Sequence, residues 1–243
     1  MDQRTAIVTG GGKRVGAAIT KSLLADGWTV LAHVHHAEDS VPDGAARVVA
    51  DLQASDGAEK IFTATAGLPP VTLLVNSAAR FAWDGLGDFS VDEFSAHMNV
   101  NVRAPALLIE RFAQLHERGT DACIVNLLDS KLAAPNPDFL SYTLSKQALA
   151  GLTELAARQL AARGIRVNAV APGLMLPSGD QTAANFQSMH TRNPLHRGVD
   201  PGDVADAIRY LADARCVTGQ VLLVDSGQRF LSLERDVQFL ETK

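Results

Sequence analysis

Short apolar runs alternate with longer amphipathic stretches along nearly the whole chain. Runs rich in aliphatic and β-branched residues are typical of strands buried in a parallel sheet. The pattern predicts seven such strands, at residues 5–9, 29–35, 47–50, 71–75, 123–128, 165–171 and 221–224.

Amphipathic stretches with helical spacing separate these runs, and Val15, Ile19 and Leu23 form the clearest stripe. Strands and helices alternate without linker or repeat, which predicts one α/β domain over residues 1–243, with a Rossmann-type, doubly wound parallel sheet flanked by helices. Pro105 should kink or break the helix that contains it. Helices after the first are expected at residues 53–65, 91–117, 139–163 and 201–211.

Two segments fit no regular pattern. Residues 174–196 mix apolar and polar pieces, and we expect them to form a mobile substrate lid. The final residues, 231–243, are amphipathic enough to dock on a neighbouring subunit, and a frayed tail fits the sequence equally well.

Composition narrows the class of protein. Of 243 residues 47% are apolar and 20% are charged, the balance of an ordinary globular chain, and the net charge of −5 argues against nucleic-acid binding. Cys123 and Cys216 both lie in apolar runs and suggest neither a disulfide framework nor a metal cluster. Neither a signal-peptide layout nor an apolar run of about 18 residues is present, so we expect a cytoplasmic protein without membrane contact.

The first strand leads into a glycine-rich turn, G-G-G-K-R-V-G from Gly10, and then into the first helix. This order is typical of a dinucleotide site, because glycine permits a tight turn and close backbone approach while the helix N-terminus attracts the pyrophosphate. We expect Gly10, Lys13, Arg14 and Val15 to contact the cofactor.

The end of the second strand indicates which cofactor is used. An NAD-binding unit carries an acidic residue about twenty positions past the glycines, to hold the ribose hydroxyls. His35 and His36 occupy this place, which favours the 2′-phosphate of NADPH. Glu38 and Asp39 follow closely and count against that choice.

Other strand ends should complete the cofactor site, since ligands of such sheets bind at the carboxyl edge. Asp51 could accept a hydrogen bond from the adenine amino group, or it could cap the following helix. The contacts expected at this edge are Asp51, Leu52, Ser77, Ala78, Ala79, Pro172 and Gly173.

Tyr142 and Lys146 lie four residues apart on a predicted helix, and Asp129 ends the fifth strand. Side chains at i and i+4 share a helix face, so the ammonium should lower the pKa of the phenol and make it a proton donor near neutral pH. The spacing also fits a half-buried tyrosine and a surface lysine on an ordinary helix.

Phe81 and Trp83 lie in a loop after the fourth strand. Loop aromatics near a cofactor cleft are candidates for stacking on a planar substrate. They could equally cap the core.

Taken together, the chain resembles the short-chain dehydrogenase/reductase family over roughly residues 5–230. The motifs that carry the resemblance are T-G-G-G-K-R-V-G from Thr9, A-D-L from Ala50, N-S-A-A from Asn76, Y-T-L-S-K from Tyr142 and R-V-N-A-V-A-P-G from Arg166. The resemblance implies that Tyr142 donates a proton, that Lys146 holds the nicotinamide ribose and that Asn101 supports a water relay to the lysine. It also implies a homotetramer.

Two departures from the family pattern are similar to its pteridine reductase branch, which includes bacterial dihydromonapterin reductases. Arg14 stands where most members have glycine, and Asp129 stands where most have serine. This similarity implies a pterin sandwiched between the nicotinamide and Phe81, with Arg14 contacting pterin and cofactor phosphates and Asp129 acting as the acid. Leu174 and Met175 complete the expected substrate contacts.

The function expected from this similarity is NADPH-dependent reduction of a dihydropteridine, such as dihydromonapterin, dihydrobiopterin or dihydrofolate, to the tetrahydro form. Two alternatives remain. If Ser130 takes the place of Asp129, the enzyme is a carbonyl or 3-oxoacyl reductase. A catalytically silent dinucleotide-binding protein is the other.

Overall fold

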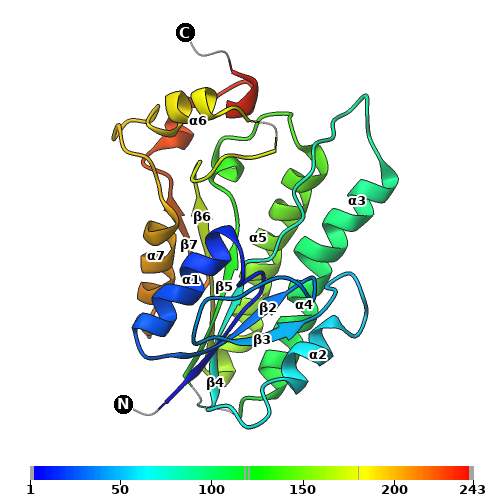
Figure 1. Cartoon of the computed structure of the whole chain (residues 1–243), viewed down its shortest axis with the longest axis vertical. Helices are drawn as coiled ribbons and strands as arrows, with labels where there is room; N and C mark the ends of the chain where they lie inside the picture. The colour runs from blue at the N-terminus through cyan, green and yellow to red at the C-terminus, as the bar shows by residue number, and fades with distance from the viewer. Residues whose placement is uncertain (1–2, 118, 120, 180, 241–243) are drawn as a thin grey trace.

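The computed structural model describes residues 3–117, 119, 121–179 and 181–240. Within these residues, seven parallel strands form one sheet in the order β3-β2-β1-β4-β5-β6-β7, as predicted (Figure 1). The strands are β1 (Thr5–Val8), β2 (Thr29–Val34), β3 (Ala46–Val49), β4 (Val71–Asn76), β5 (Ala122–Leu127), β6 (Ile165–Pro172) and β7 (Val221–Val224).

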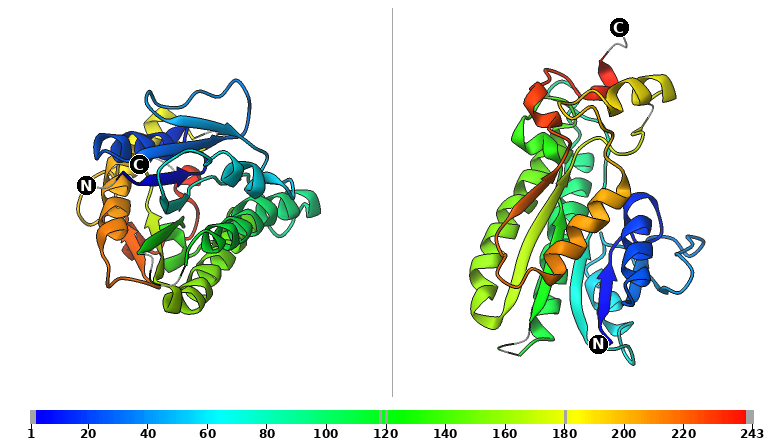
Figure 2. Two further views of the ribbon diagram at one scale, coloured as in Figure 1. Left: turned by 90° about the horizontal axis from the view of Figure 1, so that it is seen from below. Right: turned by 90° about the vertical axis from the view of Figure 1, so that its left-hand side faces the viewer.

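Helices cover both faces of the sheet. On one face α1 packs against α7, and on the other α4 packs against α2 and α5 (Figure 2). The α-helices of the described ranges are α1 (Arg14–Ala25), α2 (Gly57–Thr63), α3 (Val91–Met98), α4 (Ala104–Gln114), α5 (Leu140–Leu160), α6 (Ala183–His190) and α7 (Pro201–Asp213). None of the helices in these ranges combines the length and apolarity needed to cross a membrane.

Two apolar layers form the core because successive strand residues point to opposite faces. Ile7 packs in the layer that contains Phe112, whereas its neighbours Ala6 and Val8 pack in the layer that contains Ile19. Every residue of β5 and β6 is buried, so most of their side chains are apolar, and polar ones such as Asn126 and Arg166 make buried hydrogen bonds.

The helix predicted over residues 91–117 is divided into α3, a π-helical turn at Asn99–Arg103, and α4. Pro105 lies in the first turn of α4, where a missing N–H is tolerated, so the break comes just before the proline. The turn carries Asn101, which it buries.

The observed bounds of the other elements differ less from the predicted ones. The helix predicted at residues 53–65 begins only at Gly57, because residues 51–56 form turns. The segment at residues 174–196 contains α6, and residue 180 lies outside the described residues. After β7 the chain forms two short 3₁₀ turns, at Gln228–Leu231 and Val237–Phe239.

Candidate active site

A cavity of about 830 Å³ opens at the carboxyl edge of the sheet. β1 and β4 lie side by side in the sheet, and the strand order reverses there, which is where ligands of doubly wound folds bind. Asn101 lies outside the lining. The predicted contacts that line the cavity are Gly10, Lys13, Arg14, Val15, His35, His36, Asp51, Leu52, Ser77, Ala78, Ala79, Phe81, Asp129, Tyr142, Lys146, Pro172, Gly173, Leu174 and Met175.

The glycine-rich turn between β1 and α1 leaves a space that side chains larger than glycine would fill. Gly10 adopts φ +65°, and a Cβ on Gly16 would collide with the carbonyl oxygen of Gly10. The first residues of α1 line the cavity, so the helix N-terminus faces it with its positive dipole end. Lys13 at the N-cap supplies no side-chain cap, which leaves the first backbone N–H groups of the helix without a side-chain acceptor. These features fit the pyrophosphate of a dinucleotide.

Arg14 occupies a strained position at the start of α1. Its φ is +50°, in the left-handed region that glycine adopts without cost. Its guanidinium donates from Nη2 to the carbonyl of Pro177 over 2.8 Å, so the side chain crosses the cavity mouth to the segment after β6.

A buried histidine on β2 that sequence reasoning did not select supports the glycine-rich turn. Nδ1 of His33 accepts the Gly10 N–H over 3.2 Å, and Nε2 lies 2.9 Å from the carbonyl oxygen of Ala50. Burial lowers the pKa of His33, which fits a neutral ring with its proton on Nε2. His33 is buried because it lies within β2, which is covered on both faces, whereas His35 follows beyond the strand's end.

The histidines expected at the 2′-phosphate lie beside acidic groups. The His35 and His36 rings contact edge to face, and Nδ1 of His35 is 3.9 Å from an Asp51 oxygen. Asp39 pairs with Lys13, which lowers the pKa of that carboxyl. Its negative charge is therefore balanced by the lysine, which weakens the argument against NADPH.

Asp51 does not cap α2 directly. Its Oδ1 accepts the Gln53 N–H over 2.8 Å in a local turn, and α2 begins only after Asp56. Asp51 remains part of the cavity lining.

Asp129, Tyr142 and Lys146 meet in the floor of the cavity. The Tyr142 hydroxyl donates to Oδ2 of Asp129 over 2.9 Å, and Oδ1 accepts the Lys131 N–H over 2.8 Å. The Lys146 ammonium lies 5.6 Å from the centre of the tyrosine ring and donates to the carbonyl of Leu127 over 2.7 Å.

The predicted lowering of the Tyr142 pKa by Lys146 is wrong. Burial and the negative charge of Asp129 raise the pKa of Tyr142 well above its ordinary value. Burial also lowers the pKa of Lys146 to about 8, because little water remains to solvate its charge. The phenol is therefore held in its protonated form and can act as a proton donor.

Phe81 is the loop aromatic that enters the site. Its ring stacks on Phe139 at 4.4 Å and meets the Tyr142 ring edge to face at 4.7 Å. Phe81 keeps 40% of its surface exposed, so one part of the ring remains open to a ligand. Trp83 lies outside the cavity lining.

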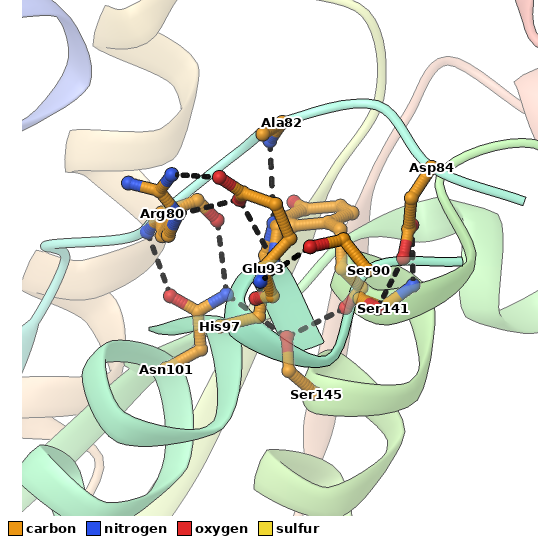
Figure 3. Close-up of polar contacts among 10 residues, drawn as sticks. Arg80, Ala82, Asp84, Ser90, Glu93, His97, Asn101, Ser141 and Ser145 are labelled. Atoms are coloured by element: carbon orange, nitrogen blue, oxygen red, sulfur yellow. Dashed lines mark hydrogen bonds and ion pairs between the residues drawn. The ribbon is translucent and has the colours of Figure 1, made fainter. Parts of the chain in front are cut away.

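Asn101 fixes the loop that carries Phe81 at the preceding residue, Arg80 (Figure 3). Oδ1 of Asn101 accepts the Arg80 N–H over 2.7 Å, and Nδ2 donates to the Arg80 carbonyl and to Oγ of Ser145. Ser145 in turn donates to the Tyr142 carbonyl over 2.7 Å. Asn101 thus ties the loop to α5, and its part in a water relay to Lys146 stays a prediction.

Two further contacts fix the same loop (Figure 3). Nε2 of His97 accepts the Ala82 N–H over 3.2 Å. The carboxylate of Asp84, which is buried, accepts the backbone N–H and the hydroxyl of Ser141 at the start of α5. Sequence reasoning missed both, because neither residue belongs to a recognisable motif.

The C-terminal segment packs against its own chain, over the cavity. Arg235 pairs with Asp138 through two nitrogens, at 2.8 and 2.9 Å, and the Phe239 and Phe139 rings stack with their centres 6.0 Å apart. Residues 231–240 are therefore not frayed, whereas docking of this segment on a neighbouring subunit stays a prediction. Residues 241–243 lie outside the described residues.

Comparison with known proteins agrees with this fold. A family model described as enoyl-(acyl carrier protein) reductase matches residues 12–229. The chain belongs to the short-chain dehydrogenase/reductase family and is an oxidoreductase.

Within the family, the chain is similar to the pteridine reductase branch, as its motifs suggested. It is 33% identical to pteridine reductase 1 of Leishmania tarentolae, covering 91% of this chain and 95% of the relative. It is 30% identical to the dihydromonapterin reductase of Citrobacter koseri, with shares of 91% and 95%. The crystal structure of FolM alternative dihydrofolate reductase 1 from Brucella canis, complexed with NADP, matches with a TM-score of 0.86 and 33% identity, over 93% of this chain and 94% of that one.

Proposed function

We propose that the protein reduces a 7,8-dihydropteridine, such as dihydromonapterin, dihydrobiopterin or dihydrofolate, to the tetrahydro form with NADPH. The observation that carries the proposal is the hydrogen bond between Tyr142 and Asp129, with the ring of Phe81 beside Tyr142. A dihydropteridine presents a flat ring that can stack on an aromatic side chain, and its reducible C=N bond needs a proton at nitrogen.

NADPH, when bound, supplies the hydride. Its phosphates fit the N-terminus of α1 and the glycine-rich turn, and Lys13, Arg14 and His36, which line the same cavity, would hold the 2′-phosphate. Asp51 and Leu52 would lie beside the adenine, Ser77 to Ala79, Pro172 and Gly173 along the nicotinamide half, and Lys146 at its ribose. Relatives named for NADP or pterin chemistry support this assignment.

The chain's own residues would handle the proton. Tyr142 holds its phenolic proton near neutral pH, since burial and Asp129 keep its pKa high. The Tyr142–Asp129 pair delivers that proton to the ring nitrogen and is recharged from water at the cavity mouth. Phe81, Leu174 and Met175 would hold the ring in place, and Arg14 would bind its polar edge.

The ketone alternative requires Ser130 in the place of Asp129. The Tyr142 hydroxyl bonds to Asp129, and Ser130 is buried in the 3₁₀ turn that follows. This arrangement favours the pteridine reading.

The test is oxidation of NADPH and NADH by the purified protein with dihydromonapterin, dihydrobiopterin, dihydrofolate and several ketones. The proposal expects turnover with at least one dihydropteridine and preference for NADPH. Reduction of ketones alone would contradict it, and NADPH binding without any turnover would favour the silent dinucleotide-binding alternative.

We further propose that residues 1–243 act as one domain within a cytoplasmic homotetramer, with residues 174–196 as a substrate lid. Leu176 and Ser178 of this segment line the cavity, which supports a role at the substrate. Light scattering of the purified protein tests the tetramer.

A further inference from the structure

The C-terminal segment brings a further carboxylate, that of Asp236, into the cavity beside Asp129 and Tyr142. Figure 1 shows this segment in red beside α6, above the carboxyl edge of the sheet. Asp236 and Val237 line the same cavity as Asp129 and Tyr142. The Asp236 side chain is only 19% exposed, so its carboxylate is largely withdrawn from water.

One oxygen of Asp236 accepts no hydrogen bond from the residues that the structure describes. Oδ1 accepts the Gln238 N–H over 3.3 Å. Oδ2 lies 3.6 Å from the ammonium of Lys131, which is close enough for charge attraction but too long for a hydrogen bond. Burial raises the pKa of Asp236, as expected of a carboxylate that has lost water without gaining enough donors.

Asp129 differs in this respect. Its two oxygens already accept the Tyr142 hydroxyl and the Lys131 N–H. Asp129 is therefore engaged with the proton donor, whereas Oδ2 of Asp236 has only the more distant Lys131 ammonium beside it among the described residues.

Hydrogen bonds to neighbouring groups hold Asp236 in position. Its own N–H donates to Oδ2 of Asp138 over 2.7 Å, and Asp138 also holds the guanidinium of Arg235. The Lys131 ammonium donates to the Asp138 carbonyl over 2.5 Å, which holds it beside Asp236. Asp138 thus holds both the backbone N–H of Asp236 and the Lys131 ammonium that lies beside its carboxylate.

We propose that Asp236 is a substrate-binding residue that accepts hydrogen bonds from N–H or O–H donors of the substrate. This inference rests on the proposed function. Dihydropteridines offer such donors in the ring N–H and amino groups and, in dihydromonapterin, in side-chain hydroxyls. A simple ketone offers neither, so Asp236 would help the site select pteridines.

The test compares wild type with Asp236→Asn in steady-state kinetics with NADPH. The amide keeps the size of the side chain and an oxygen for the Gln238 N–H, while it removes the charge. The KM for the dihydropteridine should rise about tenfold, as for the loss of a charge-assisted hydrogen bond, while kcat and the KM for NADPH stay within about twofold. Asp236→Glu should recover part of the affinity.

Glu234→Gln is the matched control, because it removes an exposed charge two residues away outside the cavity lining. Its KM should equal that of wild type. Two substrates identify the donor that is bound. A rise in KM for both 6-methyl-7,8-dihydropterin and dihydromonapterin assigns Asp236 to the ring, and a rise for dihydromonapterin alone assigns it to the hydroxyls.

Equal KM values for wild type and Asp236→Asn with both substrates would overturn the inference. If wild type turns over no dihydropteridine, the proposed function itself fails. The two proteins are then compared by binding of fully oxidised pterin to their NADP⁺ complexes, and equal Kd values there would overturn the inference separately.

Discussion

Tyr142 donates its phenolic hydrogen to Asp129 over 2.9 Å, although the two residues lie on different elements and thirteen positions apart. The lysine one turn further along α5 is directed elsewhere, to the carbonyl of Leu127. The acid chemistry of the site therefore centres on a carboxyl–phenol pair, with the lysine as a buried neighbour.

Replacing Asp129 by asparagine should lower kcat with a dihydropteridine about 100-fold or more, because the amide cannot relay a proton. The amide oxygen can still accept the Tyr142 hydrogen bond, so the KM for NADPH should change little. NADPH oxidation measures both. Asp88→Asn, at an exposed position in a loop, is the control and should behave as wild type. An Asp129→Ser enzyme that retained full turnover would instead favour the ketone alternative.

Lys146 makes stability depend on pH in a defined direction. Its pKa is about 8 when folded against 10.5 ordinarily, so the folded protein binds fewer protons at this site between these values. The free energy of unfolding should therefore rise with pH across this window relative to Lys146→Met, by about 2 kcal/mol between pH 7 and 9.5. Urea denaturation of both proteins at several pH values measures the difference.

The variant also leaves the Leu127 carbonyl without its donor, which lowers stability by an amount that does not change with pH. Only the change with pH of the difference in unfolding free energy between the two proteins therefore reports on the pKa of Lys146. Parallel curves for the two proteins would show that the ammonium is not desolvated.

Arg14 combines backbone strain with a proposed binding role, and two substitutions separate them. Arg14→Gly and Arg14→Ala both remove the guanidinium, so both should raise the KM for NADPH. Only glycine relieves the left-handed φ of +50°, so Arg14→Gly should unfold with a free energy about 1 kcal/mol higher than Arg14→Ala. Chemical denaturation decides, and equal stabilities would mean that the strain is absent in solution.

Asp84 should matter for both stability and substrate binding. Asp84→Ala leaves the buried N–H and hydroxyl of Ser141 without an acceptor, which should cost about 2–3 kcal/mol in the free energy of unfolding. Because the same loop carries Phe81, the KM for the dihydropteridine should rise as well. Asp88→Ala, in the exposed part of the loop, is the control. If Asp84→Ala is less stable but its KM is unchanged, the contact between Asp84 and Ser141 does not determine the position of Phe81.

Local pattern was enough to predict most of the fold. The apolar runs from 5–9 to 221–224 predicted seven strands near their observed positions, because strands covered on both faces are rich in apolar residues. The ends of helices were harder. The π turn at Asn99–Arg103 depends on how Asn101 is bonded to the neighbouring loop, which no local pattern records.

By itself, the sequence determined the α/β class, the glycine-rich turn and the set of residues at the carboxyl edge, because spacing and strand order place them there. Only the tertiary structure decided how these groups act on one another. The pKa of Tyr142 follows from burial and from Asp129 rather than from Lys146 on the same helix face. Asp236 reaches the cavity because Arg235 meets Asp138, 97 residues earlier, and such pairs form only when the chain has folded.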